Sequence, residues 1–319
     1  MIKNGLSPRL AEIGKIKIGG HGEKRQSKAG KDYRLPVRYD HFVVTTTEKG
    51  PDDNYIIDGE IMRQLGKEPK EIPIRLIFDD IDMNFYTSFQ LYEGHKLRCK
   101  GDGERAIWYG ENKEEKSIKC DPNTCKFAQP DAKGATKCKI SGILSCMLTS
   151  SMDIGGVYRF RTHGWNSVSN ILASLQFISE NTNGVLMGLP LKLKMLKKST
   201  QEHGNVNTVT IVLDGIEMIK MRELALGEYR NRAELGINMH QIEQRAVSAG
   251  FMEDKDDPVD VSEEFYPPVE ADSGASSPDD KPEPEPEPGT SAEEVKTELS
   301  SMDNEPEKED KTEGELGLF

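Results

Sequence analysis

Short segments in which apolar and polar residues alternate dominate the first two thirds of the chain. GKIKIGG (residues 14–20) alternates Ile with Lys, and PLKLKML (residues 190–196) alternates Leu with Lys, as strands with one buried face do. β-branched and aromatic residues are concentrated in further runs and predict strands over residues 39–47, 71–78, 140–148, 157–162 and 207–216. KLRCKGDGERAIWYG (residues 96–110) predicts a hairpin that turns at Gly-Asp-Gly.

Helical spacing is clearest in SVSNILASLQFIS (residues 167–179), which Ser167 or Ser169 can cap. Its apolar residues form one stripe, made of Ile171, Leu172, Leu175 and Ile178. Shorter helices are expected over residues 59–66 and 82–92, and the Gly-rich basic segment 19–34 is expected to be a loop. The whole pattern predicts an α+β body with a mostly antiparallel sheet over residues 1–217, followed by a helical extension over residues 218–250 that could bind a partner.

The net charge of −13 is unevenly distributed along the 319 residues. Residues 251–319 hold 24 acidic and 5 basic side chains, a net charge of −19, which leaves the first 250 residues with +6. The acidic segment is rich in Pro and Glu and poor in apolar residues, so we expect it to be a disordered tail. The mildly basic body remains compatible with a nucleic-acid partner.

Five cysteines carry the strongest chemical signal. Cys120, Cys125 and Cys138 follow a C-x4-C-x12-C spacing, and Cys99 ends the first strand of the predicted hairpin. Four thiolates of this kind can hold a closed, structural zinc ion, and the predicted zinc loop covers residues 99–146. Cys146 is the rival fourth ligand, although its apolar neighbours also suit a core residue. Free structural thiols are the alternative to zinc.

Basic residues form two groups that could face phosphates: Lys15, Lys17, Lys24, Arg25, Lys28 and Lys31 near the N-terminus, and Lys192 and Lys194 on one alternating strand. An ordinary solvated surface explains them equally well. No apolar run is long enough to span a membrane, and the N-terminus shows no secretory signal.

Catalytic patterns are weak. His163 lies beside Trp165, but no nucleophile motif and no paired histidine motif accompanies it, so we expect no enzymatic activity. A metal-dependent hydrolase would need an open coordination position, which a site of four cysteines does not offer.

The order of several short motifs resembles the phage recombination-directionality-factor-like family. These are GLSPRLAEIGKIKIGG, CKGDGERA, the cysteine loop, GVYRFRTHGWNSVSNI, GLPLKLKML and TVTIVLDG, which together span about residues 5–216. The resemblance implies a protein that binds a large serine integrase, or another phage protein acting on DNA, and redirects it from integration to excision in the bacterial cytoplasm. It also implies cysteines at Cys99, Cys120, Cys125 and Cys138 and an apolar residue in place of Cys146.

The last five residues, ELGLF, resemble the peptide motif with which bacterial replication proteins bind the sliding clamp. Leu316, Leu318 and Phe319 would be its apolar anchors, whereas Glu315 replaces the usual Gln. We therefore expect a non-enzymatic accessory protein of phage DNA recombination or replication. A single-stranded DNA-binding protein with an acidic recruiting tail is the alternative.

Overall fold

The structure is a computed structural model that describes residues 10–26, 32–52, 54–94, 96–110, 114–130, 136–151, 153–200, 204–213 and 215–251. The predicted acidic tail lies outside these residues, apart from Phe251. The described part is an α+β fold with a mostly antiparallel sheet, as the sequence predicted. It contains no helix that is long and apolar enough to cross a membrane.

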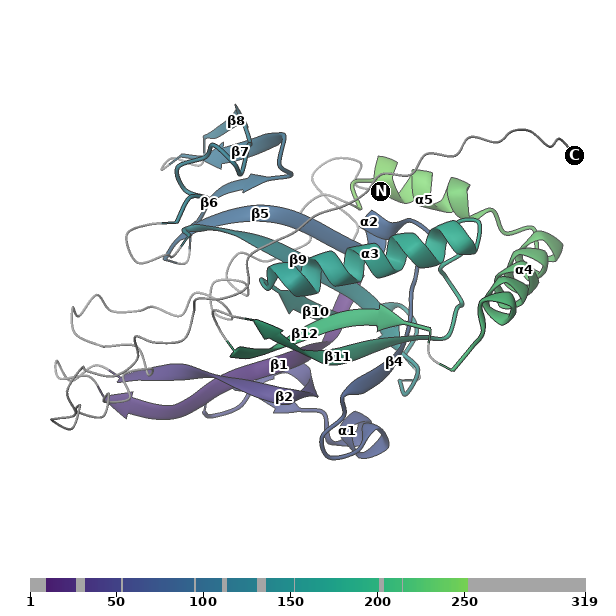
Figure 1. Ribbon diagram of the computed structural model, residues 1–319, viewed down its shortest axis with the longest axis horizontal. Helices are drawn as coiled ribbons and strands as arrows, with labels where there is room; N and C mark the ends of the chain where they lie inside the picture. Colours follow the sequence, from purple (N-terminus) through teal and green to yellow (C-terminus); the bar gives the residue numbers. More distant parts are fainter. Residues whose placement is uncertain are drawn as a thin grey trace, which may run out of the picture. The chain divides into compact units, whose positions relative to one another are not determined.

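Twelve strands make up the sheet (Figure 1). They are β1 (Ala11–Gln26), β2 (Asp32–Lys49), β3 (Tyr55–Ile57), β4 (Glu71–Arg75), β5 (Phe85–Glu93), β6 (Lys96–Gly101), β7 (Arg105–Tyr109), β8 (Glu115–Lys119), β9 (Cys138–Leu148), β10 (Gly156–Thr162), β11 (Leu191–Thr200) and β12 (Gly204–Val212). The helices are α1 (Gly59–Leu65), α2 (Ile81–Asn84), α3 (Trp165–Asn181), α4 (Met218–Glu234) and α5 (Met239–Ser248).

The main path of the sheet runs β3-β2-β1-β10-β9-β5-β6-β7-β8. Strand β9 also belongs to a branch, because its last residues Met147 and Leu148 pair with β4, which continues through β11 to β12. The strand pairings among the described residues are antiparallel except that of β1 with β10, where Lys15 lies opposite Arg159 and Ile16 lies opposite Phe160.

The hydrophobic core lies between the main path, the branch and α3. Phe42, Leu144 and Phe160 come from the main path, and Leu193 comes from the branch; each is fully buried. Helix α3 packs against β12 and β9 with its predicted stripe, of which Ile171 and Leu175 are fully buried. The alternation along β11 is confirmed over residues 191–195: Leu191, Leu193 and Met195 are buried in this core, and Lys192 and Lys194 between them are only partly buried.

The structure corrects three expectations. Residues 85–93 form strand β5 rather than the helix expected over residues 82–92, and only one helical turn, α2, precedes it. The segment expected to be a loop over residues 19–34 instead belongs mostly to β1 and β2, which form a long hairpin. No serine side chain caps α3, which begins after Gly164; the Ser167 hydroxyl instead accepts a hydrogen bond from the Val209 amide of β12.

The predicted helical extension is present as two helices. Helix α4 ends at Glu234, and Gly236, with φ of 70°, lets the chain turn before α5 begins.

Candidate functional site

The strand register brings two predicted zinc ligands to one face of the sheet. Cys99 on β6 and Cys138 on β9 both lie directly opposite Leu91, on the two sides of β5. Directly opposed residues of neighbouring strands share a face, so the two thiols flank Leu91 on the same face. The cysteines are 39 positions apart in the sequence, and the sheet makes them near neighbours.

Cys120 and Cys125 lie on a compact loop next to this face. The Asp121 carbonyl accepts hydrogen bonds from the amides of Thr124 and Cys125, and the Asp121 carboxylate accepts from the Asn123 amide and the Thr124 hydroxyl. The loop is joined to β9 because the Cys138 amide donates to the Phe127 carbonyl at 2.7 Å. A loop with few apolar residues is thus held by turns around Asp121.

A glycine makes room for Cys120. A Cβ on Gly101, two residues after Cys99, would lie 2.9 Å from the Cys120 sulfur and 2.7 Å from the Ala106 Cβ. Gly101 is therefore part of the site, although the sequence analysis used it only as a turn residue.

Cys99 and Cys138 feel the charges of the neighbouring thiols. Burial raises the pKa of Cys99 to about 11, with added repulsion from Cys120 and Cys125. Burial and the charges of the other three raise the pKa of Cys138 to about 12. Cys146 takes no part, because it is fully buried in the core, where its thiol donates to the Tyr158 carbonyl at 3.8 Å.

No three of the four sulfurs lie within 4.8 Å of one another. Among the described residues, one group brings three donor atoms within 4.8 Å of one another, and it is the surface group of Asp40, His41 and Glu68. The cysteines are free thiols in the structure. We refer to Cys99, Cys120, Cys125 and Cys138 as the cysteine cluster.

A buried ion cluster lies on the face of the main sheet away from the core. The Glu12 carboxylate accepts from Arg161 at 2.8 and 2.6 Å, from Arg159 at 3.3 Å, and lies 3.2 Å from the Lys15 ammonium. Burial would raise the pKa of Glu12, but the hydrogen bond from Arg161 and the three positive charges lower it to about 2. Glu12 is therefore ionised under all ordinary conditions.

The predicted basic residues divide between the two parts of the sheet. Lys15 belongs to the Glu12 cluster, and Lys17 lies 4.7 Å from the centre of the Tyr55 ring. On the branch, Lys192 and Lys194 lie 3.2 and 2.7 Å from the carboxylate of Glu71, whose pKa they lower.

The remaining predicted basic residues are less fully described. Arg25 is exposed near the end of β1, and Lys24 lies beside it on the same strand. Lys28 and Lys31 lie outside the described residues, as do Leu316, Leu318 and Phe319.

Arg159 and Arg161 were missed by the sequence analysis. The signal was present in GVYRFRT, because Tyr158 and Phe160 alternate with the two arginines and face the core. Because β10 is buried on both faces, its arginines need an anionic partner, and Glu12 is such a partner.

His163, the residue considered for catalysis, lies between β10 and α3. Burial lowers its pKa to about 4, with a further contribution from Lys139, so the imidazole is neutral at pH 7. A buried neutral imidazole of this kind is typical of a side chain packed inside the fold.

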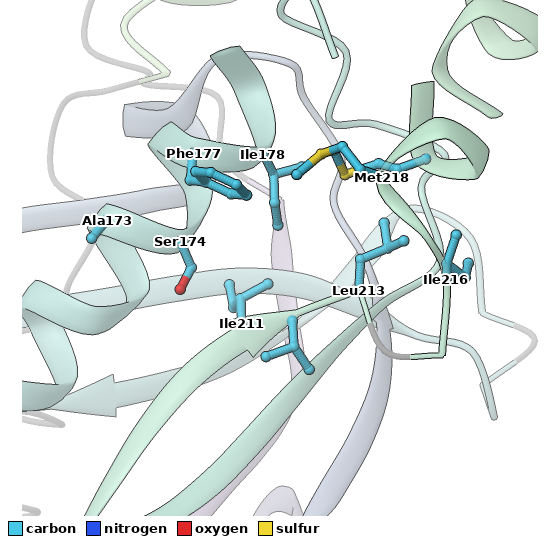
Figure 2. A pocket seen from close by; sticks show the side chains of 10 residues that line it. Ala173, Ser174, Phe177, Ile178, Ile211, Leu213, Ile216 and Met218 are labelled. Atoms are coloured by element: carbon cyan, nitrogen blue, oxygen red, sulfur yellow. The ribbon is translucent and has the colours of Figure 1, made fainter. Parts of the chain in front are cut away.

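An apolar pocket of about 560 Å³ opens between α3, β12 and the start of α4 (Figure 2). Ile178 and Ile211 form its buried floor, whereas Phe177 and Met218 at its rim are 53% and 42% exposed. Every residue that lines it is apolar except Ser174. Such a concave apolar surface with exposed large side chains is typical of a binding site.

The described part of the chain thus holds four neighbouring thiols, a buried cluster of Glu12 with three cations, and an apolar pocket. The chain belongs to the recombination directionality factor-like family, named Gp3-like, whose sequence profile matches residues 13–218. The match confirms the resemblance found in the motifs. It covers strands β2 to β12, most of β1, helix α3 and the four residues of the cysteine cluster. Neither the curated proteins nor the solved structures contain a match to this chain.

Proposed function

We propose that this protein is a non-catalytic accessory factor that binds a phage DNA recombinase, such as a large serine integrase, and changes the direction of recombination. The observation that carries the proposal is the family match over residues 13–218. The family is one of accessory factors, which act by contact with a recombinase. A partner therefore needs a surface on this chain to bind.

The pocket between α3, β12 and α4 is the contact surface that we propose. Phe177 and Met218 expose apolar area at its rim, and Ile219, the next residue on α4, is 67% exposed. Burying such side chains against a partner is favourable by about 1.5–3 kcal/mol for each one that becomes fully buried. An apolar ridge of the recombinase is the occupant that this lining favours.

The test compares Phe177→Ser and Met218→Ser with Ile154→Ser. Ile154 is 96% exposed and lies outside the pocket, so it is a matched control for loss of apolar surface. Binding to the purified recombinase of the same phage should weaken at least about tenfold for the pocket variants and stay unchanged for Ile154→Ser. Excision of a plasmid substrate should fall in parallel, and equal behaviour of all three variants would argue against this surface.

We also propose that the cysteine cluster binds one structural zinc ion. Burial and neighbouring thiols raise the pKa of Cys99 and Cys138, and a divalent cation would stabilise such a site because it favours the thiolate form. When bound, zinc would supply the attraction between β6, β9 and the loop that carries Cys120 and Cys125. Four cysteine ligands leave no coordination position for a substrate, so the ion would stabilise the fold.

The terminal peptide remains a separate proposal. Leu316, Leu318 and Phe319 end a long acidic segment, and a flexible tether of this kind raises the effective concentration of a terminal motif near its partner. We propose the sliding clamp as that partner, which would connect recombination with replication.

Direct DNA binding is a further proposal and the basis of the alternative function, a single-stranded DNA-binding protein. Arg25 is exposed on the β1–β2 hairpin, and Lys192 and Lys194 lie side by side with Glu71 on the face of β11 that points away from the core. Oligonucleotide affinity that falls steeply with rising salt would favour this alternative. Recombinase binding in the absence of DNA would favour the accessory factor.

A further inference from the structure

Three side chains with metal-binding atoms meet on the surface where β2 approaches the loop between α1 and β4. One donor atom from each of Asp40, His41 and Glu68 lies within 4.8 Å of the other two, and His41 Nδ1 lies 3.1 Å from Asp40 Oδ1. An imidazole and two carboxylates are ligands that proteins offer to zinc and to related divalent transition metals. We refer to these three residues as the Asp40 group.

A β-bulge explains how two adjacent residues of β2 reach the same place. Side chains of successive strand residues normally point to opposite faces of a sheet. Where β1 pairs with β2, however, the register shifts, so that Ile18 alone lies opposite residues 39–42. The extra residues of β2 interrupt the alternation, and the donor atoms of Asp40 and His41 therefore converge.

Hydrogen bonds of the backbone hold the third member, Glu68, beside this bulge. The Phe42 amide donates to the carbonyl of the buried Pro69 at 2.8 Å, which joins β2 to the loop. The Met195 amide of β11 donates to the Lys70 carbonyl, also at 2.8 Å. The two residues after Glu68 are thus bonded to two different strands, so the position of Glu68 relative to β2 is set by the fold.

The side chains are also prepared for a cation. The Tyr39 ring stacks on the His41 imidazole with 5.6 Å between the ring centres, which restricts rotation of the imidazole. The hydrogen bond with His41 and the charge of Lys70 lower the pKa of Asp40, so this carboxylate is ionised at neutral pH. The Lys70 ammonium lies 3.9 Å from Asp40 Oδ2 and is 54% exposed. Exposed ion pairs of this kind are weak, so Lys70 competes little with a divalent ion.

We propose that Asp40, His41 and Glu68 bind one divalent transition metal ion. The ion takes the place of the proton between His41 and Asp40, and that proton is released to solvent. Three protein ligands leave at least one coordination position for water, unlike the closed site proposed for the cysteine cluster. Two of the three ligands are carboxylates, so this site accepts Mn²⁺ as well as Zn²⁺, whereas thiolates select Zn²⁺.

Titration of the full-length protein with Mn²⁺, followed through the electron paramagnetic resonance signal of the free ion, tests this proposal. Mn²⁺ is the probe because a thiolate site binds it poorly. We expect one saturable site per chain, from which Zn²⁺ displaces Mn²⁺. His41→Gln and Glu68→Gln should each weaken binding at least about tenfold, since loss of a residue that only supports a ligand already costs about 10–100-fold. Lys70→Gln should strengthen binding about twofold or more, because it removes the competing cation.

Matched controls separate this site from general binding to carboxylates. His240→Gln on α5 and Glu60→Gln on α1 remove the same groups from exposed positions outside the Asp40 group, so both should bind Mn²⁺ as the natural protein does. Absence of saturable binding at millimolar Mn²⁺ would overturn the proposal, as would equal affinities of the natural protein, His41→Gln and Glu68→Gln. Lys70→Gln keeps all three ligands, so its affinity tests the site even if a ligand variant fails to fold.

Discussion

Arg232 of α4 donates a hydrogen bond to Asp79, with 2.5 Å between Nη1 and Oδ2, and this pair joins α4 to the loop before α2. The other oxygen of Asp79 accepts from the amides of Leu186 and Met187, each at 2.9 Å. Arg232 also donates to the Met187 carbonyl at 2.6 Å. One ion pair thus connects the helical extension with the loop before α2 and with the loop between α3 and β11.

Replacing Arg232 by Met should lower the free energy of unfolding by about 3 kcal/mol, because Asp79 would keep its charge in a partly buried place. Arg222→Met is the control on the same helix, since the exposed Arg222 donates a hydrogen bond to the uncharged Asn181 side chain at 3.0 Å. We expect less than about 1 kcal/mol for that change. Urea unfolding followed by circular dichroism measures both, and equal losses would contradict the role given to Asp79.

If the cysteine cluster binds zinc as proposed, zinc content should separate the cysteines into two classes. Protein purified without chelator should hold one zinc ion per chain, and Cys120→Ser and Cys99→Ser should each lose it. Cys146→Ser should keep it, because Cys146 is buried in the core away from the cluster. Elemental mass spectrometry gives the stoichiometry, and zinc retained by Cys99→Ser but lost by Cys146→Ser would reverse the choice of the fourth ligand.

Gly101→Ala tests the close approach of Cys120 without removing any sulfur. The new methyl group would lie under 3.0 Å from the Cys120 sulfur and from the Ala106 Cβ. We therefore expect the free energy of unfolding to fall by about 1–3 kcal/mol and the affinity for zinc to decrease. Gly110→Ala is the matched control, because its nearest contact would be 3.5 Å away. Thermal unfolding and zinc release to a colorimetric chelator are the measurements, and similar values for the two variants would contradict the crowding.

His163 makes stability depend on pH in a defined direction. The pKa of His163 in the folded protein is about 4, below its ordinary value of 6.5. Between these two pH values the imidazole is protonated in the unfolded chain and neutral in the folded chain. The contribution of the neutral imidazole to the free energy of unfolding is complete above about pH 6.5. It is lost as the pH falls toward 4, and the total loss is about 3 kcal/mol.

Urea midpoints at pH 7, 5.5 and 4.5 should therefore fall steeply for the natural protein and less steeply for His163→Gln. His240→Gln on the exposed part of α5 should follow the natural protein. Parallel curves for all three proteins would show that another group causes the acid sensitivity.

Removal of Glu315–Phe319 should abolish binding to the sliding clamp and leave recombinase binding unchanged, because the two proposed surfaces share no residue. Leu318→Ala/Phe319→Ala in the full chain should have the same effect at constant length. Surface plasmon resonance against each purified partner measures both affinities. Clamp binding that survives both changes would remove the terminal peptide from the proposal.

The strands with one buried face were predictable because alternation and burial coincide there. Leu191 and Leu193 face the core while Lys192 and Lys194 face Glu71, as the pattern of β11 required. Strand β5 was mistaken for a helix because Asp80 does cap a helical turn at Met83. The turn then ends at Phe85, where pairing with Leu144 of β9 replaces helical hydrogen bonds. Local propensity could not reveal a partner strand that lies more than 50 residues away.

The candidate site was predictable in its chemistry and only partly in its arrangement. The spacing of Cys120 and Cys125 pointed to the loop, but the meeting of Cys99 with Cys138 depends on both strands pairing with β5. The Glu12 cluster depends on the pairing of β1 with β10, which no local pattern specifies.

The parallel pairing of β1 with β10 also delays the completion of the sheet while the chain is being synthesised. Lys15 and Arg159 are 144 positions apart, so β1 emerges from the ribosome long before the strand that it must join. At about 5–20 residues per second, that interval lasts roughly 7–30 s. During this time the edge of β1 that later pairs with β10 has no partner strand. Nascent-chain chaperones would bind the hairpin at this edge.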